Sequence, residues 1–375
     1  MSLSLPPLCL YIHYPWCVRK CPYCDFNSYP CGADSERDQL YFKKLGEDLN
    51  SLEAYRQGRF FESVYFGGGT PSLCAPELVG AFLEKLSPYL SSNPEISLEA
   101  NPGTIDAARM LSFRAAGITR LSLGIQSFED DCLRALGRIH RRREALAACT
   151  AAAKIFDNFN CDLMHGLPGQ HPESALSDLK LARSAGASHI SWYELTIEEG
   201  TSFGARPPVL PSEDERETIE MAGFAYLEHS GFKRYEVSAF ARGEEWRCRH
   251  NLNYWHFGDY AGIGAGAHSK FFLHGCTWRR ACPALPGEYL KTPPVLCHEV
   301  SSAQLPFEFM LNRLRVFADL YKSEFEERTG LQFAAAQPPL EQAAKLGLVE
   351  DHGSFLRLTL RGRQMLNYIL RLYLE

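Results

Sequence analysis

The sequence predicts an α/β fold in which strands and helices alternate around a parallel sheet, either open or closed into a barrel. Short apolar runs rich in β-branched or aromatic residues recur along the first half of the chain, and longer segments with helical spacing lie between them. The runs that we expect to be buried strands are Leu8–Tyr14, Ser63–Phe66, Ile96–Glu99, Thr119–Gly124, Phe159–Met164 and His189–Leu195. The segments that we expect to be helices are Gln39–Tyr55, Pro76–Tyr89, Ile105–Ala115, Glu144–Phe156 and Glu173–Ala185.

The repeat weakens after the proline-rich stretch at 207–211. Beyond it we expect a helix at Glu213–Ser230, a strand at Arg234–Ala239 and a glycine-rich aromatic segment at Trp246–Lys270. From Pro306 onward, two helical stretches and a pair of short strands predict a small helical or winged module; the strands are Leu346–Asp351 and Ser354–Leu360. The expected division is therefore a core domain at 1–235, a connecting segment at 236–300 and a C-terminal α+β module at 301–375.

The composition of the 375 residues, 45% hydrophobic and 22% charged, is that of an ordinary globular protein. A formal net charge of -6 gives no basic excess to attract a phosphate backbone, so nucleic acid is not an expected partner. No apolar stretch is long enough for a transmembrane helix, and Met1–Tyr14 lacks the cationic start and apolar core of a signal peptide. We therefore expect a cytoplasmic protein whose 13 scattered cysteines are reduced thiols.

One group of cysteines is spaced tightly enough to bind an inorganic centre together. Cys17, Cys21 and Cys24 follow the first predicted strand in a loop, at positions n, n+4 and n+7. Soft thiolates suit an iron-sulfur cluster or zinc, and three of them can hold three irons of a 4Fe-4S cube while the fourth iron stays open. A structural zinc site, which would need a fourth ligand, and three unrelated buried thiols are the alternatives.

Polar residues also stand near the C-terminal ends of predicted strands, where βα barrels place their chemistry: Glu99, Gln126, Asp162 and Glu194. Each of them could instead cap the following turn or helix. The glycines at 67–69 follow another strand, and we expect their N–H groups to approach a polar or anionic ligand, although a tight turn is the alternative. The glycines at 262–266 superficially match a dinucleotide fingerprint, but no clean strand precedes them and an extended segment follows, so no Rossmann site is expected.

The spacing C-x-x-x-C-x-x-C, with Tyr23 just before the last cysteine, is the signature of the radical S-adenosylmethionine (SAM) superfamily. Within it the whole chain resembles the branch that contains oxygen-independent coproporphyrinogen III oxidase and, closest to this sequence, the heme chaperones of the HemW group. The segments that carry the resemblance are Tyr11–Cys17, Gly67–Ser72, Glu99–Gly103, Gly124–Phe128, Asp162–Pro168 and His250–Trp255.

This resemblance implies a partial (β/α)6 barrel similar to a TIM barrel, a 4Fe-4S cluster, and SAM bound to the open iron and cleaved to a 5′-deoxyadenosyl radical. It places Tyr11, Gly68 and Glu99 around that SAM, and Tyr23 beside it through its backbone. The positions that match contacts to a second SAM in the oxidase are Gly69, Thr70, Gln126, Arg138 and Asp162. It also implies an electron donor for the cluster, and no catalytic residue is assigned.

Two features favour the heme chaperones over the oxidase. Asp25 and Phe26 follow Cys24, whereas the oxidase pattern has a further cysteine two residues after the third ligand. The segment His250–Trp255 resembles the H-N-x-x-Y-W motif of the chaperones, with His250 as a candidate heme ligand and Tyr254 and Trp255 as packing partners of the macrocycle.

Further candidates in this segment are Arg247 or Arg249 for the heme propionates and Cys248 for ligation or attachment. From the residues alone, His250 could equally be a hydrogen-bonded turn residue beside two core aromatics. The resemblance implies a heme chaperone that passes heme to an acceptor protein. An oxygen-independent oxidative decarboxylase of coproporphyrinogen III is the alternative, and a radical SAM methyltransferase ranks last.

Overall fold

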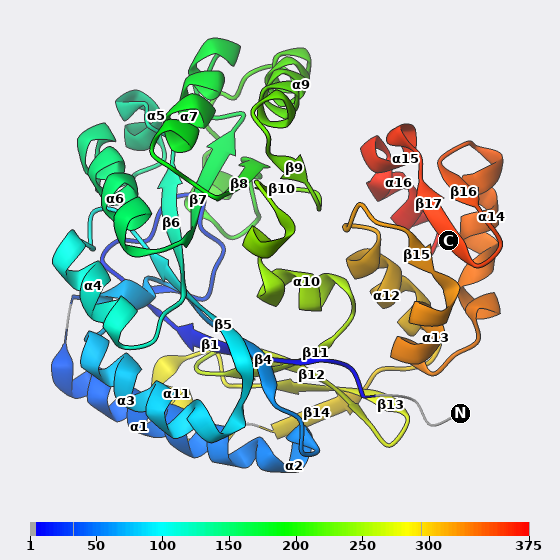
Figure 1. The fold of residues 1–375 in the computed structure, drawn as a ribbon, viewed down its shortest axis with the longest axis horizontal. Helices are drawn as coiled ribbons and strands as arrows, with labels where there is room; N and C mark the ends of the chain where they lie inside the picture. The colour runs from blue at the N-terminus through cyan, green and yellow to red at the C-terminus, as the bar shows by residue number, and fades with distance from the viewer. Residues whose placement is uncertain (1–4, 33, 294, 375) are drawn as a thin grey trace.

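The computed structural model describes residues 5–32, 34–293 and 295–374. Within these residues the largest sheet has twelve strands in the order β14-β13-β12-β11-β1-β4-β5-β6-β7-β8-β10-β9 (Figure 1). Its strands are β1 Leu8–Tyr14, β4 Phe61–Gly68, β5 Leu90–Ala100, β6 Arg120–Gln126, β7 Asn158–His165, β8 His189–Glu194, β9 Lys233–Arg234, β10 Ala239–Ala241, β11 Asp259–Ile263, β12 His268–Leu273, β13 Cys276–Ala281 and β14 Val295–Glu299.

The central strands β1, β4, β5, β6, β7 and β8 run parallel to one another, and they are the strands that the sequence predicted. β1 has the predicted bounds, and the others differ from the predictions mainly at their ends. The sequences of these strands are apolar because helices cover the outer face of the sheet and side chains fill its inner face. Leu121 and Leu123 in β6 are buried, as are the alternate residues Arg120 and Ser122.

Helices lie on the outside of the curved sheet, as Figure 1 shows for α4, α6 and α7. The helices of the core are α1 Ser35–Ser51, α2 Glu53–Arg56, α3 Pro76–Leu86, α4 Ala107–Ala115, α5 Asp130–Ala135, α6 Arg142–Ile155, α7 Pro172–Ser184, α8 Ser202–Ala205, α9 Glu213–His229, α10 Arg249–Trp255 and α11 Pro286–Tyr289. Local signals fix several of their starts. Asp106 accepts the N–H of Arg109 at 2.8 Å before α4, and Ser212 and Glu215 form a capping box before α9.

The structure differs from the sequence prediction at Arg234–Ala239. Instead of one strand, the chain forms the short strands β9 and β10, which pair with each other in antiparallel register, Phe240 opposite Arg234. β10 then pairs with β8, also antiparallel, and continues the sheet past the last parallel strand. The prediction failed because the residues between β9 and β10 form a turn whose apolar side chains imitate a strand.

The predicted connecting segment contributes strands β11 to β14, which extend the sheet on the other side of β1. β11 contains Gly262, so a strand does run into the glycines, contrary to our expectation. β12 follows as another strand rather than a helix, and the segment is therefore not a dinucleotide fingerprint. Buried ion pairs anchor β11, because Asp259 accepts from Arg59 Nη1 at 2.8 Å and from Lys270 Nζ at 3.0 Å.

The C-terminal residues form a compact body with its own small sheet, ordered β15-β17-β16, and its own apolar core around Phe309, Phe325 and Ile369. Its elements are α12 Leu305–Arg313, β15 Leu320–Tyr321, α13 Lys322–Thr329, α14 Gln337–Lys345, β16 Val349–Asp351, β17 Phe355–Leu358, α15 Leu360–Gln364 and α16 Leu366–Arg371. In Figure 1 this body stands beside the large sheet, with α10 between them. The division of the chain into 1–235, 236–300 and 301–375 stays a prediction.

None of the helices in the described part of the chain combines the length and the apolar character that crossing a membrane requires.

Candidate functional site

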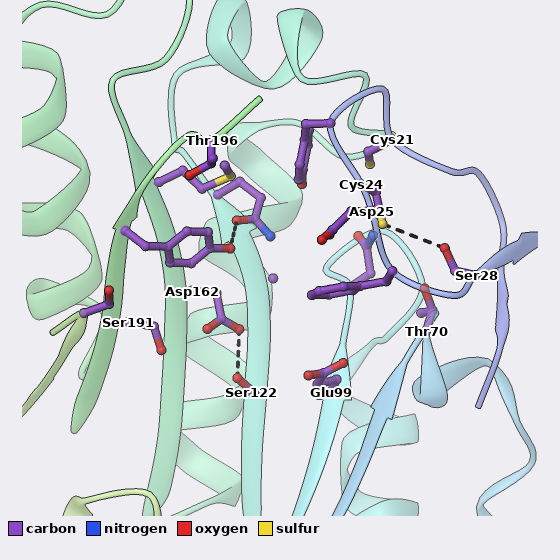
Figure 2. Close-up of a pocket in the computed structure, with 18 of the residues that line it drawn as sticks. Cys21, Cys24, Asp25, Ser28, Thr70, Glu99, Ser122, Asp162, Ser191 and Thr196 are labelled. Carbon is purple, nitrogen blue, oxygen red and sulfur yellow. Dashed lines mark hydrogen bonds between the residues drawn. The ribbon is translucent and has the colours of Figure 1, made fainter. Parts of the chain in front are cut away.

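A cavity of about 490 Å³ lies at the C-terminal ends of the parallel strands. Its walls include the loop after β1, the ends of β5 to β8, and residues that follow β9 and α12. The polar residues predicted at strand ends, Glu99, Gln126, Asp162 and Glu194, all line it. Figure 2 shows Cys21 and Cys24 on the loop, above the strand ends that carry Glu99 and Asp162.

The loop that carries the three cysteines is fixed at its start. β2 (Trp16–Cys17) pairs with β3 (Tyr29–Pro30), and the indole of Trp16 packs edge-on against Tyr41 with ring centroids 4.7 Å apart. A turn between Cys21 and Cys24, with the Cys24 N–H donating to the Cys21 carbonyl at 3.1 Å, then returns the chain. All three thiols line the cavity.

The arrangement of these donors fits an iron-sulfur cluster. Burial raises the pKa of the Cys17 thiol, and the nearby thiols of Cys24 and Cys21 raise that pKa further, so the three groups share one neighbourhood. Among the residues that the structure describes, no three His, Cys, Asp or Glu side chains are close enough to bind one metal ion. A 4Fe-4S cube bonds each thiolate to a different iron, so its three ligands need not converge on one point.

Gly67 and Gly68 end strand β4, and Gly69 follows it directly. The N–H of Gly68 donates to Glu99 Oε2 at 3.1 Å, and the N–H of Gly69 donates to the Tyr14 carbonyl at 2.8 Å. A Cβ on Gly69 would stand 2.4 Å from the carbonyl oxygen of Trp16, closer than any real contact. In this structure both N–H groups are bonded within the protein, and Gly69 lets the start of the cysteine loop pack directly on the end of β4.

Two carboxylates line the cavity, that of Glu99 in β5 and that of Asp162 in β7. Glu99 accepts from the Tyr65 hydroxyl at 3.0 Å, and Asp162 accepts from the Ser122 hydroxyl at 2.8 Å and from Asn160 Nδ2 at 2.7 Å. Burial, and after it the charge of Asp162, raises the pKa of Glu99 to about 7. Burial also raises the pKa of Asp162. Both groups keep acceptor capacity for the hydroxyl or amino groups of a ligand.

Neutral and cationic groups complete this part of the wall. Gln126 ends β6 in the left-handed region at φ 67°, and its Oε1 accepts from the Tyr193 hydroxyl at 3.0 Å. Arg138 donates to the Gly124 carbonyl at 2.7 Å and approaches the sulfur of Cys21 at 3.5 Å. Arg138 thereby ties the cysteine loop to the sheet and places positive charge beside a predicted thiolate ligand.

The structure brings most of the predicted cofactor residues to this one cavity. Those that line it are Tyr23, Gly69, Thr70, Glu99, Gln126, Arg138, Asp162 and Trp255. Tyr11 and Gly68 lie just behind the wall, where the Tyr11 hydroxyl bonds to His13 Nδ1 at 2.9 Å. Tyr254 instead lines a second, smaller cavity of about 260 Å³, which Trp255 also lines.

His250 is buried beneath the cavity, with 1% of its surface exposed. Its Nδ1 is bonded to Ser63 Oγ at 2.9 Å and its Nε2 to the Tyr254 hydroxyl at 3.1 Å, while its ring stacks on Tyr65. Burial lowers the pKa of His250 to about 3. Since both ring nitrogens are used, this conformation offers none to heme iron, and the hydrogen-bonded alternative describes the residue.

The other heme-contact candidates of this segment also point elsewhere. Arg249 donates to the Asn93 carbonyl at 2.8 Å, and Arg247 pairs with Glu244 at 3.3 Å. Cys248 is buried, and burial raises the pKa of its thiol to about 12, which suppresses the reactive thiolate. None of these three residues is among those that line the two cavities.

Several cavity residues were missed by the sequence interpretation. Ser122, Ser191 and Tyr193 line the cavity; Ser122 lies four positions before Gln126 on β6, and Ser191 and Tyr193 lie two positions apart on β8. The period of two along a strand could have identified them. Glu236 and Arg315 also line the cavity, but they lie in irregular segments where no local pattern marks an inward-facing side chain.

Comparison with known proteins identifies the family of the chain. The family model of the radical SAM superfamily matches residues 11–182, and that of the HemN C-terminal domain matches residues 300–365. The heme chaperone HemW of Escherichia coli is 42% identical over 99% of both chains, and that of Haemophilus influenzae is 43% identical over 99% of both. The heme chaperone HemW of Bacillus subtilis is 32% identical over 97% of this chain and 98% of its own.

Among solved structures, the coproporphyrinogen III oxidase HemN from Escherichia coli matches with a TM-score of 0.82 over 99% of this chain and 91% of its own. The two sequences are 22% identical, so the likeness establishes the shared α/β fold and not the activity.

Proposed function

The chain belongs to the HemW family of heme chaperones and contains a radical SAM domain, and from this we propose that it binds heme and transfers it to an acceptor protein. The observation that carries the proposal is similarity to heme chaperones along almost the whole chain, including both the radical SAM part and the C-terminal part. The acceptor is a heme-requiring protein, and a separate electron donor would reduce the cluster.

Cys17, Cys21 and Cys24 are the proposed ligands of the 4Fe-4S cluster that the radical SAM domain implies. The proposal is supported by their shared cavity and by the cation Arg138 beside Cys21, which would help to balance the charge of a thiolate-bound cluster. The cluster and SAM together supply one-electron chemistry when bound. The surrounding residues orient SAM and shield it from water.

The SAM-binding residues are proposed to be those around the two carboxylates. Glu99 offers an ionised acceptor for the ribose hydroxyls or the amino group, and Gln126 and Asp162 offer further polar contacts in the same cavity. Thr70 and the backbone of Gly69 and Tyr23 lie next to the cysteine loop, where the ligand of the fourth iron would be bound. Tyr11 and Gly68 support this site from behind, Gly68 through its bond to Glu99.

For heme, Trp255 and Tyr254 are the proposed aromatic contacts, because Trp255 lines both cavities and Tyr254 lines the smaller one. In this conformation both ring nitrogens of His250 are hydrogen-bonded, so the residue does not serve as an axial ligand. Its bonds to Ser63 and Tyr254 hold α10 against β4, so it positions the aromatic residues instead.

The test is a titration of hemin into the reconstituted protein, followed by a transfer assay. The Soret band should shift on binding, and the bound heme should move to an apo-protein acceptor that has a higher affinity. Trp255→Ala should weaken binding, while Trp246→Ala, outside both cavities, serves as the matched control. Absence of a Soret shift in the unaltered protein would eliminate the proposal.

The same preparation can be used to test whether the protein is instead a coproporphyrinogen III oxidase. Phe26, 57% exposed, lines the cavity at the position where the oxidase pattern has its additional cysteine. Anaerobic incubation with coproporphyrinogen III, SAM and reductant should therefore yield no protoporphyrinogen IX. Formation of that product would replace the chaperone proposal by an oxidative decarboxylase.

A further inference from the structure

One wall of the large cavity is built where the C-terminal body meets the sheet. We call it the C-terminal wall, and its residues are Glu236, Val237, Ser238, Asn251, Trp255 and Arg315. The backbone fixes it, since the Val237 N–H donates to the Arg315 carbonyl at 3.1 Å and Glu236 forms a β-bridge with Val316. The C-terminal body therefore contributes directly to the cavity that holds the cysteine loop.

Arg315 brings an unneutralised charge to this wall. Its Nε donates to the Leu311 carbonyl at 3.2 Å, and within the described residues its two terminal nitrogens have no hydrogen-bond or ion-pair partner. Arg138, which also lines the cavity, is by contrast committed to the Gly124 carbonyl and to Cys21. A guanidinium with two open N–H groups in a cavity matches the geometry of a carboxylate.

Trp255 lies directly beside that charge. The guanidinium carbon of Arg315 stands 5.3 Å from the centre of the Trp255 ring, a cation-π distance. The indole N–H is buried, and no acceptor for it exists among the residues that the structure describes. A buried donor without a partner is costly, so a ligand oxygen at this place would satisfy it.

From this geometry we propose that Arg315 and Trp255 together bind a carboxylate of the porphyrin, Arg315 pairing with the propionate and Trp255 contacting the macrocycle. The inference rests on the proposed function and assigns to the C-terminal body a direct part in holding heme. It replaces Arg247 and Arg249, which bond elsewhere, as the source of the propionate contact. A flat anionic ligand suits an aromatic face next to a planar cation.

Glu236 is the acidic residue of the same wall. It accepts the Ser238 N–H at 3.1 Å and forms no ion pair with Arg315. Burial raises the pKa of Glu236 to about 7, which favours its uncharged form, while the Ser238 N–H and the charges of Arg234 and Arg315 oppose this rise. A carboxylate ligand is therefore not excluded from the wall by a fixed negative charge.

The experiment compares hemin with hemin dimethyl ester, which lacks the propionate charges, on the full chain. Arg315→Gln should weaken hemin binding on the order of 10-fold, because a charge-assisted pair is lost. Binding of the dimethyl ester, already weaker, should be the same in Arg315→Gln and in the unaltered protein. Arg315→Lys should fall between, since it keeps the charge and loses the paired N–H geometry.

Arg371→Gln is the matched control, because Arg371 also stands over an aromatic ring of the C-terminal body, 5.9 Å from the centre of Tyr368, but lies outside the cavity. It should leave both affinities unchanged. SAM affinity and the thermal unfolding midpoint should be unchanged in Arg315→Gln, which separates a porphyrin carboxylate from the carboxylate of SAM. A loss of SAM affinity with unaltered hemin affinity would reassign Arg315 to SAM and overturn the inference.

Three further outcomes would also overturn it. Equal loss of hemin and dimethyl ester in Arg315→Gln would mean that Arg315 acts only through the fold. No loss with hemin, while the unaltered protein binds it, would reject the role of Arg315 and leave the chaperone function standing. Failure of the unaltered protein to bind either compound would instead reject the proposed function, and the inference with it.

Discussion

The imidazole Nδ1 of His250 lies 2.9 Å from the hydroxyl oxygen of Ser63, which ties α10 to the central strand β4. Together with the bond from Nε2 to the Tyr254 hydroxyl, this contact makes His250 a buried structural residue between α10 and the sheet. A motif that looks suited to heme ligation therefore places its histidine where iron has no access in this conformation. The aromatic residues of the same motif reach the cavities because His250 holds their helix.

We expect His250→Ala to destabilise the protein by about 2 to 5 kcal/mol, because it leaves a void and removes both bonds of the buried ring. His250→Gln should cost less, about 1 to 2 kcal/mol, since an amide can keep one of these bonds. Urea unfolding measures both values. If His250→Gln folds normally and binds hemin with an unshifted Soret maximum, His250 is not an axial ligand; a shifted maximum would show that it is.

The same residue should make stability depend on pH. Folding lowers the pKa of His250 to about 3 from its ordinary value near 6.5, so the unfolded chain takes up a proton that the folded one rejects. Its contribution to stability is complete above pH 6.5 and is lost as the pH falls below that value. The stability difference between the unaltered protein and His250→Gln should therefore shrink between pH 7 and pH 5. A constant difference would contradict the assigned pKa direction.

SAM affinity should increase as the pH rises through about 7. The pKa of Glu99 is raised to about 7, and its ionised form is the better acceptor for SAM hydroxyl and amino groups. Glu99→Gln should weaken SAM binding on the order of 10-fold and remove this pH dependence. Equilibrium binding between pH 6 and pH 8 tests it. Glu198→Gln is the control, because Glu198 lines the same cavity but is not one of the predicted SAM contacts.

Gly69→Ala should prevent correct docking of the cysteine loop. The added methyl group would meet the Trp16 carbonyl at 2.4 Å, and backbone on both sides must move to relieve the clash. We expect a loss of at least about 2 kcal/mol and a lower iron and sulfide content after reconstitution. Gly46→Ala is the matched control in helix α1, where a Cβ meets nothing within 4 Å, and it should stabilise by about 0.5 to 1 kcal/mol.

Alanine at any one of Cys17, Cys21 or Cys24 should abolish stoichiometric iron and sulfide, since each thiolate holds a separate corner of the cube. Cys31→Ala is the control, because Cys31 follows the same loop but lies outside the cavity lining and accepts from Arg37. It should retain a full cluster. Unchanged iron and sulfide in all three variants, or stoichiometric zinc in place of iron, would refute the assignment.

By itself the sequence determined the alternating α/β order, the position of β1 to the residue, and the group of polar side chains at strand ends. These features depend on local sequence patterns, because a buried parallel strand must be apolar and βα folds place their functional residues at the C-terminal ends of the strands. For that reason the sequence alone predicts Glu99, Gln126, Asp162 and Glu194 as site residues, and all four line the cavity.

Only the tertiary structure decided how the segment 236–300 joins the sheet, why glycines are needed at the end of β4, and which residues His250 and Arg315 contact. Each of these depends on a contact between residues far apart in sequence, such as the bond from Val237 to Arg315 or the close approach of Gly69 to Trp16. Local propensity carries no information about such contacts, because their energy comes from packing and from satisfying buried polar groups once the chain has closed.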